Sequence, residues 1–169
     1  MILDLIPLPQ FIALHVGISL IGIVSGLVAL PAMARGWWVP RTQAVFLVTT
    51  LLTSLTGFLF PFHGFTPAIG VGAISTVDLV VAFVALFALD RASWARAAYA
   101  ISATVALWLN LFVLVAQVFQ KVAVLDALTP SVMLAAQSLL LIAMLVLGAA
   151  LLRRAQAKDE RNAANRATA

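Results

Sequence analysis

The side chains with the chemistry to bind a ligand or to move a proton are few in this chain, and several lie inside apolar runs. Asn110 and Gln117 belong to the run 97–119, and Lys121 follows it. At 100° per residue these side chains point in one direction to within about 20°, so they form a polar stripe along a helix. Hydrocarbon cannot satisfy the amides, so we expect both amides to face the interior of a helical bundle.

Asp78 is the carboxylic acid that lies deepest within an apolar run. Near the middle of a membrane an ionised Asp is disfavoured by about 2.5–3.5 kcal/mol, so we expect Asp78 to be neutral or to have a partner. Ser75 lies one turn away, and Asn110 lies at a similar depth on the next run. Asp78 either carries protons or cations, or forms a hydrogen bond between helices that fixes their packing.

His15 and His63 lie at corresponding ends of two adjacent runs. Two imidazoles at similar depth could hold a haem or a metal ion between them, or lie beside a quinone. The alternative for His63 is an ordinary turn residue, since Pro61 precedes it and Gly64 follows it. The chain has no cysteine, which excludes Cys-ligated zinc, iron–sulfur clusters and thiol catalysis.

The elements that must position these residues are long apolar helices. Hydrophobic residues make up 64% of the chain and charged residues 9%, whereas soluble domains have about 25% charged residues. Five runs come close to the roughly 20 residues that a transmembrane helix needs. We predict an all-α membrane protein with one transmembrane domain, residues 1–152, and a polar tail, residues 153–169, that frays. The domain is a five-helix transmembrane bundle with spans at about 11–33, 43–61, 70–89, 97–119 and 130–152.

The basic residues predict the orientation of this bundle. Nine of the ten Lys and Arg residues fall on one side of the five predicted spans, and Lys121 is the exception. Because basic connectors stay in the cytoplasm, we expect an external N-terminus and a cytoplasmic C-terminus. The basic residues lie singly beside apolar runs, so the net charge of +4 is interpreted as a topology signal and not as a nucleic-acid site.

Polar residues collect toward the predicted outer half of the membrane, as they would around a pocket open to the external side. The inner half of the third span, in contrast, has no polar side chain. We expect the pocket to be lined by one polar side chain or more from four of the five spans: His15, Ser75, Asp78, Asn110, Gln117 and Gln137.

Two further patterns predict close helix packing without chemistry. Gly22 and Gly26 form a GxxxG motif, which lets two helix backbones approach and is expected to pack within the monomer in preference to a dimer. The hydroxyl-rich run 49–56 in the second span can return its hydroxyls to backbone carbonyls four residues earlier.

Three segments carry a resemblance to known proteins: TGFLFPFH at the end of the second run, LNLFVLVAQVFQKV in the fourth, and LTP before the fifth, together with a His early in the first. Over nearly the whole chain, this combination resembles a group of uncharacterised small multi-spanning membrane proteins from alphaproteobacteria. The resemblance implies a multi-pass protein of the bacterial cytoplasmic (inner) membrane.

For the function, we expect a non-enzymatic bundle that binds a ligand or a partner in the lipid bilayer, as a homo-oligomer or with another membrane protein. One alternative is a redox subunit that binds haem or quinone near His15 and His63. A second alternative is a small transporter that uses Asp78 for proton coupling, although such transporters usually show paired repeats and broken helices.

Overall fold

The computed structural model describes residues 7–60, 67–122 and 130–168, and all regular structure in these ranges is helical. The all-α class predicted from the sequence is therefore confirmed. The five helices match the five apolar runs: α1 (Leu8–Ala34), α2 (Pro40–Gly57), α3 (Pro67–Ala88), α4 (Ala95–Lys121) and α6 (Pro130–Ala167). His63 and residues 123–129, between α4 and α6, lie outside the described residues.

Proline and glycine explain several of these helix boundaries. Pro40 occupies the first turn of α2, where its missing N–H costs nothing because that group has no partner within a helix. Gly36 follows α1 with φ of 96°, in the left-handed region that glycine adopts without steric penalty. The short connection from α1 to α2 turns the chain back on itself.

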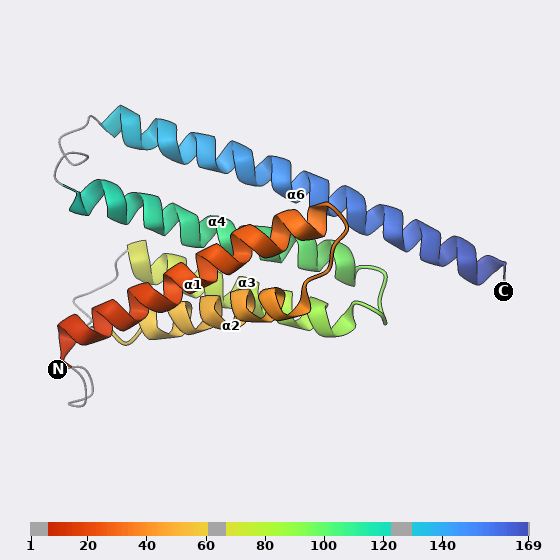
Figure 1. Cartoon of the computed structure of the whole chain (residues 1–169), viewed down its shortest axis with the longest axis horizontal. Helices are drawn as coiled ribbons and strands as arrows, with labels where there is room; N and C mark the ends of the chain where they lie inside the picture. The colour runs from red at the N-terminus through yellow and green to blue at the C-terminus, as the bar shows by residue number, and fades with distance from the viewer. Residues whose placement is uncertain (1–6, 61–66, 123–129, 169) are drawn as a thin grey trace.

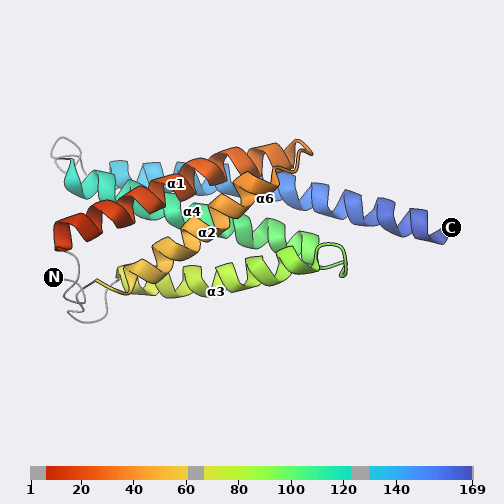
Figure 2. The same ribbon diagram turned by 60° about the horizontal axis from the view of Figure 1, so that its bottom comes forward.

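Neighbouring helices run antiparallel, and α4 contacts all four of the others. In Figure 1, α4 lies between α6 on one side and α2 and α3 on the other, and α1 crosses over α4. Figure 2 shows α2 crossing from α1 to α3. The chain termini lie at opposite ends (Figure 1). We call the end where α1 and α3 finish the basic end, because Arg35, Arg41, Arg91 and Arg96 lie there. The opposite end is called the His15 end.

Four of the five helices, all except α2, are long and apolar enough to cross a membrane. The surface of α2 also suits a membrane environment, since this helix points its apolar side outward and its polar side inward. Val48 and Leu55 are exposed, whereas Gln43 and Thr50 are buried. This inverted pattern suits a protein surrounded by hydrocarbon, where polar groups need partners inside the protein. The chain is a multi-pass membrane protein.

The predicted GxxxG packing within the monomer is confirmed between α1 and α2. A methyl group at Gly22 would lie 3.0 Å from the Thr49 hydroxyl, and one at Gly26 would lie 2.8 Å from the Phe46 ring. Since any larger residue would press against these side chains, the two glycines let α1 pack closely on α2.

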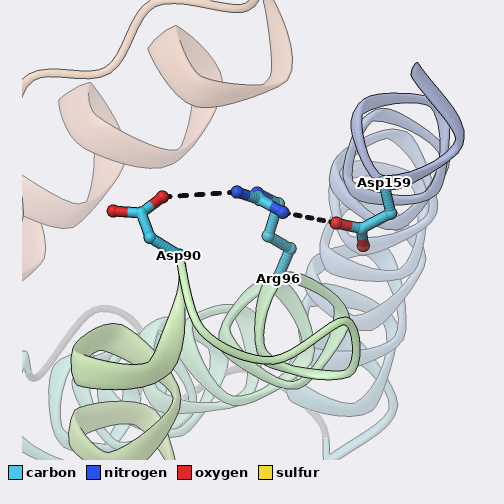
Figure 3. A network of polar contacts seen from close by, with 3 residues as sticks. All are labelled: Asp90, Arg96 and Asp159. Carbon is cyan, nitrogen blue, oxygen red and sulfur yellow. Dashed lines mark hydrogen bonds and ion pairs between the residues drawn. The ribbon is translucent and has the colours of Figure 1, made fainter. Parts of the chain in front are cut away.

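The expectation that residues 153–169 fray is wrong, because α6 continues as one helix of 38 residues to Ala167. Figure 1 shows this extension projecting past the rest of the bundle. Two contacts hold it. Arg154 donates to the backbone carbonyls of Ala34, at 3.0 Å, and Arg35, at 2.8 Å. One turn further, Asp159 accepts a hydrogen bond from Arg96 at 2.5 Å (Figure 3).

A buried hydrogen bond joins α2 to α4 near the basic end. The Tyr99 hydroxyl donates to Gln43 Oε1 at 2.6 Å, and each residue is 1% exposed. Gln43 Nε2 in turn lies 3.5 Å from the Ala29 carbonyl of α1. The Trp38 ring covers Tyr99 at a centroid distance of 5.7 Å. This pair therefore connects three helices through one amide.

We predict that Gln43→Leu and Tyr99→Phe each lower the free energy of unfolding by about 1–3 kcal/mol, because each leaves a buried polar atom without its partner. The double variant removes both atoms and should cost less than the sum of the two single changes. Unfolding in mixed detergent micelles measures these values, and strictly additive effects would contradict a coupled pair.

Candidate functional site

The polar side of α2 is the centre around which the candidate site residues gather. Its hydroxyls reach side chains on three different helices. The three bonds are Thr56 to His15 Nδ1 of α1 at 2.8 Å, Ser54 to Ser75 of α3 at 3.0 Å, and Asn110 Nδ2 of α4 to Thr50 at 3.1 Å. Three of the six residues predicted to line the pocket thus contact α2, the helix from which no pocket residue is predicted.

The hydroxyls of α2 also bond to their own backbone, as predicted from the sequence. Thr49 donates to the Val45 carbonyl at 2.7 Å, and Thr53 donates to the Thr49 carbonyl at 2.9 Å. Each hydroxyl has a single proton. Once that proton is directed to a backbone carbonyl, the oxygen is left to accept from a neighbouring helix.

The same bonding bears on the His15 ring. When the Thr56 proton is on the Leu52 carbonyl, at 2.7 Å, the Thr56 oxygen can accept from His15 Nδ1 at 2.8 Å; in the other tautomer Nδ1 accepts from Thr56. A neutral imidazole that donates from Nδ1 carries its lone pair on Nε2. The Phe60 ring lies edge-on to the imidazole at a centroid distance of 5.1 Å. Because His63 lies outside the described residues, haem or quinone binding between the two histidines stays a hypothesis.

Asp78 and Asn110, which the sequence places at similar depth, have different partners. The Asp78 carboxyl lies beside the Ser102 hydroxyl of α4, while Asn110 donates to Thr50 of α2. The Oδ2 atom of Asp78 is buried and has no hydrogen-bond partner within the described ranges. A buried carboxyl oxygen without a partner is costly for an ionised group, and less so for a protonated one.

The two glutamines of the predicted pocket have opposite environments. Gln137 of α6 donates from Nε2 to the Phe112 carbonyl of α4 at 3.0 Å. Gln117 is exposed, so the expectation that it faces the interior is wrong. Its helical direction matches that of Asn110, but it lies only four residues from the end of α4, where headgroups and water can satisfy an amide.

These residues therefore bond to neighbouring helices in several separate contacts. A hollow of about 100 Å³ lies at the other end of the molecule, between the α3–α4 connector and α6, and Asp90, Arg96 and Asp159 line it. An open pocket at the His15 end stays a prediction. Within the described ranges, no three His, Asp or Glu side chains are grouped to hold a metal ion.

The buried pair of Gln43 and Tyr99 is not predicted from the sequence. Gln43 begins the predicted span 43–61, and Tyr99 lies in the apolar run 97–119. The available signal was Gln43 itself, an amide within an apolar helix that needs a partner inside the protein.

No family model, curated protein or solved structure matches this chain.

We predict that Asn110→Leu and Gln117→Leu have different effects, although the two residues share a helical direction. Asn110→Leu removes a bond between α4 and α2 and should cost about 0.6–2 kcal/mol of unfolding free energy. Gln117→Leu changes an exposed side chain and should stay within about 0.5 kcal/mol. Thermal melts in a mild detergent compare them, and equal destabilisation would show that Gln117 has a buried role.

Proposed function

We propose that the chain is a non-enzymatic protein of a bacterial inner membrane that binds a membrane-protein partner along α6. The observation that carries this proposal is the environment of α6, which is the least buried of the four apolar helices. Only 6% of its apolar stretch is buried, compared with 22–33% for α1, α3 and α4.

One side of α6 packs on the bundle, and the other is mostly apolar between residues 132 and 149, with Ser138 as an exposed polar residue there. Met144 and Leu151 are buried, whereas Leu139 is 71% exposed. Alanines lie on the exposed side as well, at positions 135 and 149. Small residues let a second helix approach closely, and lipid does not require them. The face also leads directly into the anchored extension, which gives a partner one continuous helix to contact.

The positions of the basic residues support an orientation of the protein in which its basic end faces the cytoplasm. If α2 crosses the membrane with its polar side covered by α1, α3 and α4, the five helices leave the N-terminus and the C-terminus on opposite sides. The basic end then lies in the cytoplasm, together with the α6 extension. The cytoplasmic part of a partner would meet the extension, and its membrane helix would meet the exposed side of α6.

The absence of cysteine from the sequence makes a direct test possible. Single cysteines at Leu139, Ile142 and Val146 of α6, labelled with a thiol-reactive photocrosslinker in native membranes, should give a discrete crosslinked band. Matched cysteines at Val77 and Val84 of α3, which are also exposed, are the controls. The mass of the adduct distinguishes a second copy of the chain from another protein. Crosslinking to lipid alone at all positions would contradict partner binding.

A second candidate function is proton or cation transfer at Asp78, and the unpartnered Oδ2 atom is the observation that favours it. A carboxyl with one free oxygen can gain and lose a proton without breaking an existing bond to that oxygen. Ser102 lies beside it on α4, and Ser75 lies on the same helix, bonded to Ser54. These two hydroxyls are placed where they could pass a proton onward.

If Asp78 transfers protons, Asp78→Asn should abolish proton flux into vesicles that contain the purified protein, since an amide side chain cannot bind and release a proton near neutral pH. The fold should survive because the amide has the same shape. Asp90→Asn, at a carboxylate that is 96% exposed on the α3–α4 connector, is the matched control and should leave flux unchanged. Equal flux in the native chain and Asp78→Asn would restrict Asp78 to a structural role.

A further inference from the structure

A group of cations at the basic end has no acidic partner in the described part of the chain. The ion pairs found there all involve Arg96, which bonds to Asp90 at 3.4 Å and to Asp159 at 2.5 Å. Arg154 is also engaged, by the carbonyls at the end of α1. The cations that remain are exposed and come from both connectors and from α6: Arg35, Arg41, Arg91, Arg153, Lys158 and Arg161. We call them the cation ring.

The contacts of α6 place the cation ring at the level where the bundle leaves the hydrocarbon. Arg154 binds the last carbonyls of α1, so neighbouring Arg153 lies at the level of Arg35. Arg41 begins α2 and Arg91 follows α3, both at this same end. Lys158 and Arg161 lie roughly 6 and 10 Å further along the helix than Arg154.

Three exposed tryptophans lie among these cations. Trp37 is 70% exposed, Trp94 is 53% exposed, and Trp38 is 44% exposed. Tryptophan prefers the boundary between hydrocarbon and headgroups, because its ring is apolar and its N–H is polar. Their positions indicate that the cation ring meets the phosphate layer of the bilayer.

We propose that the cation ring binds the headgroups of anionic phospholipids, such as phosphatidylglycerol, in preference to zwitterionic ones. A guanidinium presents several donors to phosphate oxygens and keeps its charge at all relevant pH values. A zwitterionic headgroup brings an ammonium group that the same cations repel. Glu160 is the only acidic residue at this end outside the Arg96 ion pairs, so the local charge stays strongly positive in the described part of the chain.

The tryptophans provide the reporter for a test. Three of the four tryptophans lie at the basic end, and Trp108→Phe removes the fourth, whose buried Nε1 has no partner among the described residues. The full chain is placed in phosphatidylcholine vesicles, part of which is replaced by brominated phosphatidylglycerol or brominated phosphatidylcholine. Bromine quenches nearby tryptophan. Binding at the ring should give phosphatidylglycerol a roughly five-fold higher relative affinity, the effect expected of about one well-placed cation.

Variants and salt locate the preference. The triple variant Arg35→Gln, Arg41→Gln, Arg91→Gln should lose the preference for phosphatidylglycerol, whereas Lys121→Gln at the His15 end should keep this preference. Salt near 1 M, where the Debye length is about 3 Å, should weaken the preference of the unmodified protein. The salt measurement does not depend on whether the triple variant folds. Equal quenching by the two lipids, or a preference that survives both the triple change and high salt, would overturn the proposal.

Discussion

Burial of the polar side of α2 is the constraint on which the other helices depend. Gln43, Thr50 and Ser54 are nearly inaccessible, and hydrocarbon offers no replacement for the hydrogen bonds that they make. Helices α1, α3 and α4 each contribute a bond to this side, through His15, Ser75, Asn110 and Tyr99. The helix that is least able to stand alone in lipid is therefore the one that determines how its neighbours are arranged.

Features that depend on local sequence could be predicted, and features that depend on which helices meet could not. The helix positions follow from runs of apolar residues, and the return of Thr49 and Thr53 hydroxyls to the backbone follows from spacing within one helix. The bond between Gln43 and Tyr99 joins residues 56 positions apart, so it appears only once α2 lies beside α4. Gln117 shows the converse, because it shares its helical direction with Asn110 and is nevertheless exposed.

The polar tail illustrates a different reason for failure. Residues after 152 have no apolar face, which is why the sequence suggests fraying. The helix persists because specific polar contacts replace apolar packing: Arg154 binds the end of α1, and Asp159 binds Arg96. Arg96 is only 14% exposed, so its charge is partly shielded from solvent and its bond to Asp159 is less screened than an open surface pair. Alanine, a strong helix former, also recurs along this segment.

The contact between Arg154 and the end of α1 couples the position of α6 to that of the α1–α2 corner. Its guanidinium holds two carbonyls of the α1–α2 corner, and a side chain at Gly36 would collide with that guanidinium at 2.8 Å. A load applied to the projecting end of α6 is therefore transmitted to the corner, and from there to the polar side of α2. The residues that fix the position of α6 at rest are the same ones through which a pull on it would reach the interior of the bundle.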